Sequence, residues 1–544
     1  MGQGQNSQEV VRAMGRPEFY PHAVTGLRHL QTHLSHIFLT GPFAYKLKKP
    51  VDLGFADFRA LAARRRFCND ELFLNRRLAP EVYLEVLAVV QGPGGPALAA
   101  QASPGGPVLD YVLKMVQMDA GRMMDRLLDA GQVDAGQVRG LARVLAGFYR
   151  RAGRGPQVDF SGRPQQVRLN VEENFRQTEH SKGVTVSPAR WQAVADYSLD
   201  FLRRQRGLLE QRVAQGRIVD GHGDLHSGNI NLPATGRPII FDCIEFNERF
   251  RHQDQACDLA FLAMDLDFHG RPDLSQALVQ EFVARSGDQG LPAVLDFYKC
   301  YRAVVRAKVY GFMFEDPEVE RDERFRDLDR ARAYWRLAAG YAGGEPPFFL
   351  LCFMGRMGTG KSFLAQALQR TLGWRIFSSD LLRKDRAGLK PGERSYDAWG
   401  QGLYGPQATQ ATYQALLDGA GVQLAMGAGA IVDASLREEA WRRRFRELAA
   451  RYDARLLFVE VYAAPEVVAE RLAQREAAGG SASDGRRELV AAQAAAWQEP
   501  SPEVAAHLLR VDGGRPEAEK VAAVLARLGE MGWQAPAEQP GGSE

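Results

Sequence analysis

Three polar residues stand at spacings used by enzymes that transfer phosphoryl groups. In HGDLHSGNI (222–230), Asp224 precedes Asn229 by five positions, and Asp242 follows thirteen residues later at the end of an apolar run, IIFDCIEF. A carboxylate at 224 can accept the proton of an attacking hydroxyl. An amide and a second carboxylate can hold the Mg²⁺ that neutralises nucleotide phosphates. The spacing predicts a catalytic base at Asp224 and metal ligands at Asn229 and Asp242.

A lysine upstream completes this set. FAYK (43–46) places Lys46 on a strand-like run, where an ammonium can reach the α- and β-phosphates, and Glu71 on the following helical stretch can pair with it. Lys48 points to the same strand face and is the alternative nucleotide lysine. Glu71 alone is equally typical of a surface carboxylate, and an isolated Asp and Asn beside glycines are typical turn formers. The ordered combination favours a kinase site.

These motifs resemble a known family. HGDLHSGNI, IIFDCIEF and CDLAFLAMD together look like the aminoglycoside phosphotransferases, a branch of the protein-kinase-like fold, over residues 20–338. The resemblance implies that Asp224 is the base, that Asn229 and Asp242 bind metal, and that Asp258 braces the catalytic loop, with His222 structural.

Two departures from protein kinases fit the same branch. Gly223 stands where protein kinases carry arginine, and the first hairpin has Gly41 without a GxGxxG loop. The aminoglycoside phosphotransferase group also lacks that loop. Little in the sequence identifies an aminoglycoside as the acceptor.

A second phosphate-binding motif lies further along the chain. GRMGTGKS (355–362) matches G-x-x-x-x-G-K-[ST] between an apolar strand and a helical pattern. Gly355, Gly358 and Gly360 let backbone N–H groups close around phosphates, Lys361 reaches the β/γ oxygens, and Ser362 ligates Mg²⁺. The alternative is a glycine-rich turn, which the full match and its context disfavour.

Four further residues indicate a small-molecule kinase. Asp380, predicted at the end of the strand in WRIFSSD, can face an acceptor hydroxyl, and Asp433 in GAIVDAS can support the metal as a Walker B carboxylate. Arg471 and Arg475 lie four residues apart, as in a lid that closes on the transferred group. A solvated amphipathic helix explains the arginine pair equally well.

Residues 348–530 resemble the small P-loop kinases, which include gluconate kinase, chloramphenicol phosphotransferase and zeta-toxin-like enzymes. The order of the two modules looks like a bacterial bifunctional family in which an aminoglycoside phosphotransferase-like domain is fused to a P-loop ATP-binding domain. That description assigns no substrate.

The hydrophobic pattern divides the chain accordingly. A predicted hairpin (36–49), a helix (58–78) and strands at 82–90 and 108–116 precede a mostly helical region. Alternating strands and helices follow GYAGGEPP. The sequence therefore predicts an α+β bilobal kinase-like domain (20–338), a linker (339–347), an α/β P-loop NTPase domain with a parallel sheet (348–530) and a disordered tail (531–544).

The composition of the chain limits which partners and which cellular location we expect. With 544 residues and a net charge of +3, the chain has no excess charge that would indicate nucleic acid. Its five scattered cysteines suit reduced thiols, its N-terminus is polar, and no apolar run approaches the roughly 20 residues that span a bilayer. We therefore expect a cytoplasmic protein without a membrane partner; the sequence does not indicate its oligomeric state.

The functional prediction is an ATP- and Mg²⁺-dependent phosphotransferase with two nucleotide sites and small hydroxylated acceptors. Two alternatives remain at this stage. One is a regulator that binds nucleotide as a switch, and the other is a toxin-like P-loop kinase restrained by the kinase-like domain.

Overall fold

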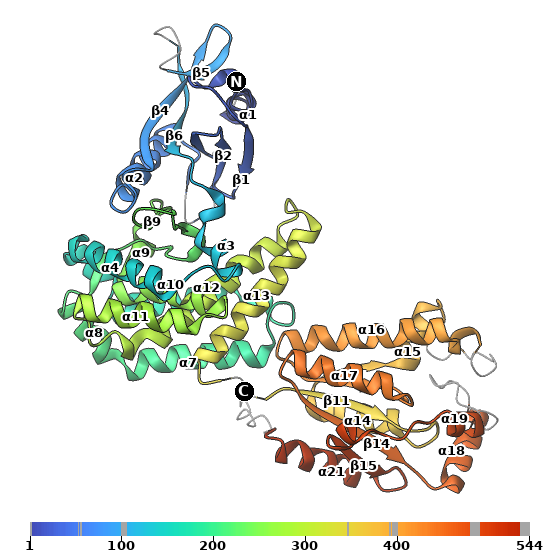
Figure 1. Cartoon of the computed structure of the whole chain (residues 1–544). Helices are drawn as coiled ribbons and strands as arrows, with labels where there is room; N and C mark the ends of the chain where they lie inside the picture. Colours follow the sequence, from blue (N-terminus) through green and yellow to red (C-terminus); the bar gives the residue numbers. More distant parts are fainter. Residues whose placement is uncertain are drawn as a thin grey trace, which may run out of the picture. The chain divides into compact units, whose positions relative to one another are not determined.

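The computed structural model describes residues 3–52, 54, 57–99, 106–344, 347–390, 393, 401–478 and 490–533, without the side chains of 3–6 and 475–478. The chain forms two compact units (Figure 1). Unit 1 comprises 1–177 and 195–308, and unit 2 comprises 178–194 and 309–544. Two of the three divisions fall inside α7 (Pro188–Arg204) and α12 (Pro292–Glu315), and the third follows Gln177. The domain boundaries inferred from sequence stay a prediction.

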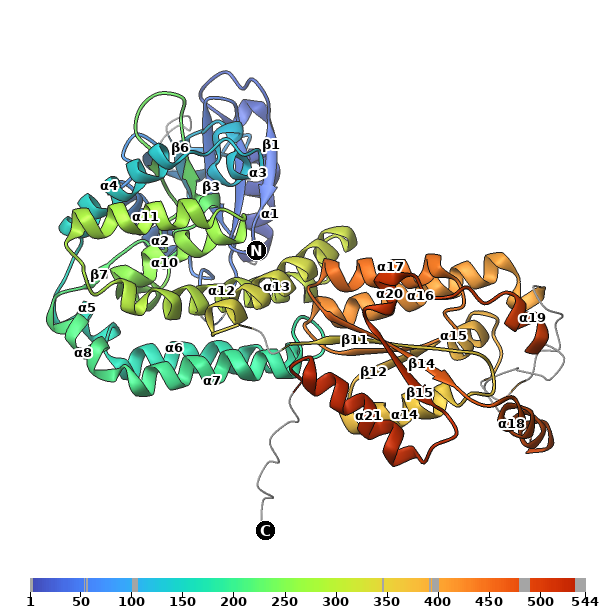
Figure 2. The same cartoon turned by 60° about the horizontal axis from the view of Figure 1, so that its bottom comes forward.

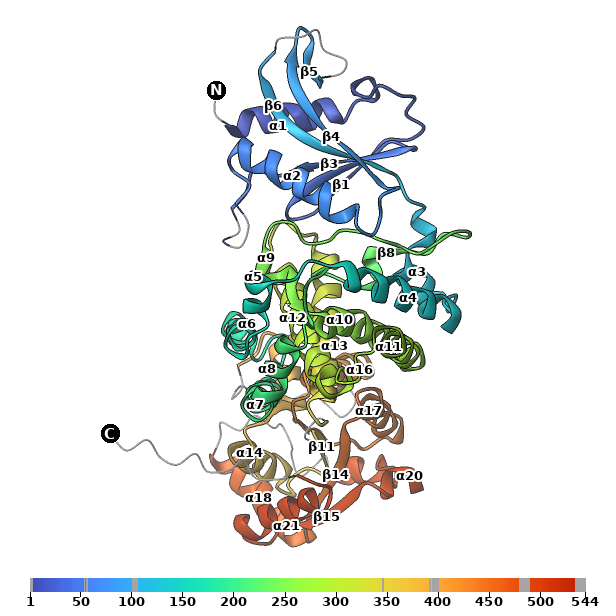
Figure 3. The ribbon, with the colours of Figure 1, turned by 90° about the vertical axis from the view of Figure 1, so that its left-hand side faces the viewer.

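Unit 1 begins with a six-stranded antiparallel sheet in the order β1-β2-β3-β6-β4-β5 (Figure 3). Its strands are β1 (Arg28–Gln31), β2 (Ser35–Leu39), β3 (Phe43–Lys48), β4 (Tyr83–Gly92), β5 (Gly95–Leu98) and β6 (Val108–Val116). The predicted hairpin is confirmed, because β2 and β3 pair around a turn in which Gly41 has φ +100°.

The two faces of this sheet have different partners. Helix α1 (Gln3–Met14) contributes Val10 and Met14 to a buried cluster that also contains Tyr45 and Leu47 of β3. Since successive strand residues point to opposite faces, Lys46 and Lys48 face the other side. Helix α2 (Leu61–Asn75) packs against β4 and β6 and supplies Glu71 to the lysines on that side. Strand alternation thus directs both lysines toward α2.

The rest of unit 1 is mainly helical, as predicted. Its helices are α3 (Met124–Asp129), α4 (Ala135–Arg151), α5 (Pro156–Ser161), α6 (Pro164–Gln177), α8 (Arg206–Ala214), α9 (Glu248–Arg251), α10 (Gln255–Phe268) and α11 (Pro272–Ser286), with parts of α7 and α12. Short strands β7 (Ile218–Asp220), β8 (Ile230–Asn231), β9 (Ile239–Ile240) and β10 (His252–Asp254) flank the loop that contains Asp224. Helix α10 is buried from Gln255 to Leu266 and provides a rigid support beneath this loop.

Unit 2 contains a five-stranded parallel sheet in the order β12-β13-β11-β14-β15, which confirms the predicted parallel sheet. The strands are β11 (Phe349–Met354), β12 (Arg375–Ser378), β13 (Ala430–Asp433), β14 (Arg455–Tyr462) and β15 (Leu508–Asp512). The helices are α13 (Arg321–Tyr341), α14 (Lys361–Leu372), α15 (Ser379–Arg386), α16 (Pro406–Ala425), α17 (Glu439–Arg451), α18 (Pro465–Ala478), α19 (Val490–Ala495), α20 (Pro502–Ala505) and α21 (Glu517–Glu530).

Among the described residues, single-turn 3₁₀ helices join these elements: η1 (Pro17–Phe19), η2 (Ala120–Arg122), η3 (Glu179–Ser181), η4 (Ser227–Asn229) and η5 (Gly402–Tyr404). In the described part of the chain, no helix has both the length and the apolar character needed to cross a membrane.

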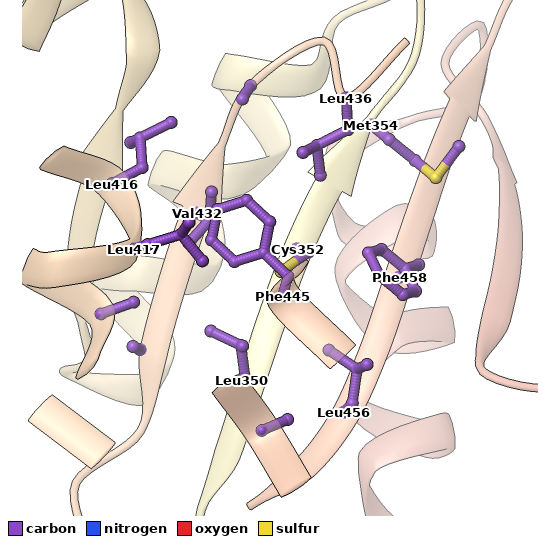
Figure 4. Close-up of a cluster of buried hydrophobic side chains, with 14 of the residues drawn as sticks. Leu350, Cys352, Met354, Leu416, Leu417, Val432, Leu436, Phe445, Leu456 and Phe458 are labelled. Atoms are coloured by element: carbon purple, nitrogen blue, oxygen red, sulfur yellow. The ribbon is translucent and has the colours of Figure 1, made fainter. Parts of the chain in front are cut away.

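Helices cover both faces of the parallel sheet (Figure 2). Leu350, Cys352 and Met354 of β11 point to the face covered by α16 and α17, where Phe445 of α17 joins the cluster (Figure 4). The intervening residues of β11 point to the face covered by α14 and α21. A central strand buried on both sides explains why FFLLCFM is continuously apolar.

Three details differ from the sequence prediction. Strand β12 ends at Ser378, so Asp380 lies in the first turn of α15 and not at a strand end. Strand β15 lies where further helix was expected. The predicted tail begins at 531, yet Met531 and Trp533 pack against the unit 2 core; residues 534–544 lie outside the described part.

The core of unit 2 offers a test of this packing. Phe445→Ala removes a fully buried ring and should cost about 3–5 kcal/mol of unfolding free energy, because the cavity cannot close completely. Phe363→Ala, at a half-exposed ring in the same unit, is the matched control and should cost less than about 1 kcal/mol. Urea unfolding followed by tryptophan fluorescence measures both. Equal losses would contradict the core assigned to α17.

Candidate phosphoryl-transfer sites

The loop that contains Asp224 is held by one buried carboxylate. Asp258 of α10 accepts backbone N–H bonds from His222 (2.7 Å) and Gly223 (3.0 Å), and a hydroxyl bond from Tyr149 (2.9 Å). His222 is buried, and its Nε2 lies 3.0 Å from the Phe241 carbonyl. Burial also lowers the pKa of His222, so the ring is neutral and structural. Asp258 therefore has the bracing contacts that the family resemblance implies.

Asp224 and Asn229 face each other across this loop. The Asn229 side-chain amide donates to the Asp224 carbonyl and to its Oδ2, both at 3.0 Å. His226 Nε2 lies 3.5 Å from the same carboxylate. The structure thus brings the predicted base and the predicted amide ligand together.

The environment of Asp224 keeps its carboxylate ionised. Removal from water acts to raise the pKa of Asp224, but the charge and hydrogen bond of His226, followed by the charge of Arg306, outweigh it. The pKa of Asp224 therefore lies below its ordinary value. An ionised carboxylate can orient an acceptor hydroxyl and take its proton late in the transfer.

Asp242 lies two residues beyond β9, in an unusual backbone conformation. Its φ is +62°, in the left-handed region that side-chain-bearing residues avoid. Its N–H donates to the Tyr83 hydroxyl at 3.1 Å, and the next amide, of Cys243, donates to Asn75 Oδ1 at 2.8 Å. Contacts with β4 and α2 thus hold the Asp242 carboxylate in place.

Lys46 connects three distant parts of unit 1. Its Nζ lies 2.8 Å from Glu71 Oε1 and 2.7 Å from Asp242 Oδ1. The Lys46 side chain is 14% exposed and that of Asp242 is 44% exposed, so this end of the cluster is open to water. The predicted lysine, glutamate and metal-binding aspartate therefore converge.

Lys48 occupies the closed end of the same cluster. Its side chain is 2% exposed, and Nζ contacts Glu71 Oε2 at 2.7 Å and Glu245 at hydrogen-bond distance. The ring of Phe58 covers it, with the centroid 5.2 Å from Nζ. The geometry favours Lys46 as the nucleotide lysine, since Lys48 is enclosed. Glu71 is 0% exposed and is not a surface carboxylate.

Charge pairing in this cluster overcomes the cost of burial. Burial raises the pKa of Glu71, but Lys46 and Lys48 lower it further, to about 2. The pKa of Lys46 is raised, because Asp242, Glu71 and Glu245 outweigh its burial. Burial raises the pKa of Glu245, and the charge of Lys48 opposes that rise. Two ammonium groups and the ionised Glu71 thus form the centre of the cluster.

The second site is built on the loop between β11 and α14. Gly355, Gly358 and Gly360 all have positive φ (+134°, +78° and +98°). A Cβ atom on Gly355 would lie 2.4 Å from the Val461 carbonyl oxygen, so no larger residue fits there. Lys361 Nζ lies 3.3 Å from the Arg356 carbonyl of the same loop.

A buried carboxylate lies beside this loop. Asp433 ends β13 in register with Phe353 of β11 and is 5% exposed. Burial raises the pKa of Asp433, Asp380 raises it further, and Lys361 and a hydrogen bond from Ser362 lower it. The four predicted residues of this site, Lys361, Ser362, Asp380 and Asp433, are therefore neighbours.

The two predicted lid arginines are only partly described. Arg471 of α18 donates to the Thr359 carbonyl (3.1 Å) and to the Gly513 carbonyl (2.8 Å), so its guanidinium joins the loop to the end of β15. The side chain of Arg475 lies outside the described residues. A lid role for this pair stays a prediction.

Sequence reasoning missed Glu245 and Tyr149. Glu245 lies three residues after Asp242 and Tyr149 lies on α4, and neither position belongs to a spacing rule used for kinases. A signal was present for Glu245, because a glutamate in an apolar run needs a cationic partner. No comparable signal marks Tyr149.

Comparison with known proteins agrees with this geometry. The family model described as an AAA domain matches residues 350–500. Uncharacterized proteins of Mycobacterium tuberculosis and Mycobacterium bovis are 33% identical over 472 residues, covering 86% of this chain and 89% of each relative. The chain belongs to their family. The AAA match lies within the predicted P-loop domain, which agrees with the predicted resemblance for that part of the chain.

Two solved structures show limited similarity to this chain. A choline/ethanolamine kinase family protein from Mesorhizobium loti is 14% identical, with a TM-score of 0.35, and the match covers 61% of this chain and 99% of that one. A gluconokinase from Sinorhizobium meliloti is 22% identical, with a TM-score of 0.26, and the match covers 35% and 95%.

The two lysines should differ in their effect on stability. Lys48→Met leaves Glu71 and Glu245 facing each other in a closed site and should cost about 3–5 kcal/mol. Lys46→Met should cost less, because Lys48 still pairs with Glu71 and water reaches Asp242. Urea unfolding of the two variants measures the difference. The opposite order of stability would show that the enclosed lysine is misassigned.

Glu71 should also produce a recognisable pH dependence. Since its pKa is about 2 in the folded protein and about 4.5 ordinarily, its ionised form stabilises the fold above pH 4.5. That contribution is lost as pH falls toward 2. The difference in unfolding free energy between wild type and Glu71→Gln should therefore be largest near pH 7 and shrink below pH 4.5.

Glu85→Gln, at an exposed position, is the control for this titration. Its unfolding free energy should stay within about 0.5 kcal/mol of wild type at every pH. A constant difference for Glu71→Gln would contradict an ionised, doubly paired Glu71.

Proposed function

We propose that the protein is a phosphotransferase that uses ATP and Mg²⁺ at two separate sites and transfers the γ-phosphoryl group to hydroxyls of small molecules. One observation supports this proposal above the others. Lys46 contacts both Glu71 and Asp242 within 3 Å, close to a loop in which Asn229 bonds to Asp224. Unit 2 has its own candidate residues for binding phosphate, holding metal and acting on the acceptor.

In unit 1, Asp224 acts on the acceptor. Its ionised carboxylate orients the hydroxyl and takes its proton while the oxygen forms a bond to the γ-phosphorus. The bond between that phosphorus and the β–γ bridging oxygen breaks, and ADP leaves. Lys46 binds the phosphates, and Glu71 holds Lys46 in position.

The donors at this site suit a divalent metal. Asn229 and Asp242 offer an amide and a carboxylate oxygen, and Asp242 already contacts a cationic ammonium. Mg²⁺ needs only one or two protein carboxylates, because phosphates and water supply its other ligands. Bound Mg²⁺ would neutralise the phosphate charge that develops during transfer.

In unit 2, the loop from Gly355 to Ser362 would enclose the phosphates, and Lys361 would reach the β- and γ-oxygens. Ser362 and Asp433 would hold the metal, and Asp433 ends β13 beside the strand that leads into the loop. Asp380, in the first turn of α15, would act on the second acceptor hydroxyl. Arg471 and Arg475 would close over the nucleotide.

Other features fit this proposal. The five cysteines are free and buried, which suits a reducing cytoplasm. We place the kinase-like domain at 20–338 and the P-loop domain at 348–530. The charged residues described at both sites favour two catalytic sites over a regulatory nucleotide switch.

The decisive experiment disables each site separately. Wild type, Asp224→Asn and Lys361→Ala are incubated with ATP, Mg²⁺ and a panel of hydroxylated compounds, and mass spectrometry detects the gain of one phosphoryl group. Each variant should lose its own product by at least a hundredfold and keep the other. Nucleotide binding without any transfer would support the regulator, and full first-site activity in Asp224→Asn would exclude Asp224 as the base.

A further inference from the structure

The phosphate loop of unit 2 has a side-chain partner that its motif does not include. The backbone N–H of Met357, at the third position of GRMGTGKS, donates to Gln493 Oε1 at 2.8 Å. Gln493 lies on α19, 136 positions away in sequence, and is 7% exposed. A buried glutamine therefore sits directly against the loop that would enclose the phosphates.

The segment after α19 is anchored independently of the loop. The Gln498 N–H donates to the Arg437 carbonyl at 3.0 Å, and the Glu439 N–H donates to Gln498 Oε1 at 2.7 Å. The buried guanidinium of Arg442 donates to the Gln498 carbonyl at 2.7 Å and lies 5.1 Å from the ring of Trp497. These contacts tie the segment to the residues after β13, so Gln493 is held in place before any ligand binds.

The orientation of the Gln493 carboxamide determines which of its atoms can contact a ligand. Its oxygen is engaged by the Met357 N–H, so the adjoining Nε2, which carries two hydrogens, is the group left to meet a ligand. The N–H groups of a P-loop point at phosphate oxygens, and a donor beside them faces the same anion. A carboxylate at 493 would place negative charge there instead.

We propose that Gln493 is a phosphate-binding residue of the unit 2 nucleotide site, with Oε1 fixing the loop and Nε2 donating to a phosphate oxygen. This inference rests on the proposed nucleotide site at Lys361. It adds α19 to that site and assigns the ligand contact to a nucleoside di- or triphosphate, because a nucleoside has no phosphate oxygen to accept from Nε2.

The test compares Gln493→Ala and Gln493→Glu in the full chain, with Lys46→Met in the background so that only unit 2 binds nucleotide. Calorimetry measures the affinity for ATP, ADP and adenosine. Gln493→Ala should weaken ATP and ADP about tenfold or more, as for a lost hydrogen bond to a charged group. Gln493→Glu should weaken them at least as much, and adenosine affinity should not change in either variant.

The glutamate variant separates ligand binding from a purely structural role. Glutamate keeps an acceptor for the Met357 N–H but replaces the Nε2 donor with negative charge, so unchanged ATP affinity in Gln493→Glu would overturn the inference. Gln366→Glu, at an exposed position of α14, controls for the added charge and should bind ATP like the background protein.

A third variant separates failure of the proposed nucleotide site from failure of the role given to Gln493. Lys361→Ala in the same background should abolish ATP binding. If the background protein itself binds no ATP, the proposed nucleotide site fails. If it binds ATP and both Gln493 variants bind equally well, the site stands and the role of Gln493 fails.

Discussion

The arrangement of unit 1 depends on one carboxylate that has no contact with water. Glu71 is completely buried, and an ionised carboxylate is stable there only when cations replace the lost hydration. Lys46 and Lys48 provide them, from adjacent positions on one face of β3. Because both bonds must form together, they fix the position of α2 against the sheet and the direction of Lys46 toward Asp242. Glu245 completes the closed end, so the same cluster also holds the segment after Asp242.

Unit 2 brings its site residues together by means of a parallel sheet. All of its strands run in one direction, so the ends of β11 and β13 bring the phosphate loop and Asp433 to one edge without a long-range salt bridge. The helix that follows the loop then presents its N-terminal amides to that edge. Unit 1 relies on paired side chains, whereas unit 2 relies on backbone geometry and strand direction.

This difference explains how much of each site could be predicted. The P-loop is contiguous, so its glycines, Lys361 and Ser362 could be recognised from spacing alone. In unit 1, strand alternation placed Lys46 and Lys48 on one face, but their different exposure depends on how α2 and Phe58 cover the sheet, which no local pattern encodes. The partners of Glu245 and Gln493 could not be predicted, because they come from other elements; the apolar run around Glu245 indicates only that a cation must lie near it.

The remaining differences have similar physical causes. Strand β15 was missed because LLRVD is short and stands between helical patterns, and its pairing with β14 decides its conformation. Asp380 was expected at a strand end, and the chain instead turns into α15 at Ser379. The first error concerns the type of an element and the second where a strand ends, and neither changes which residues meet at the site.

The left-handed backbone of Asp242 has a consequence for how this protein responds to engineering. Such a conformation costs a residue with a Cβ atom about 1–3 kcal/mol, and glycine would relieve it. A screen for thermal stability alone would therefore favour replacing Asp242, and it would remove the carboxylate that faces Lys46. At this position tolerance to heat and chemical capability oppose each other, so a stabilised variant has to draw its gains from other parts of the chain.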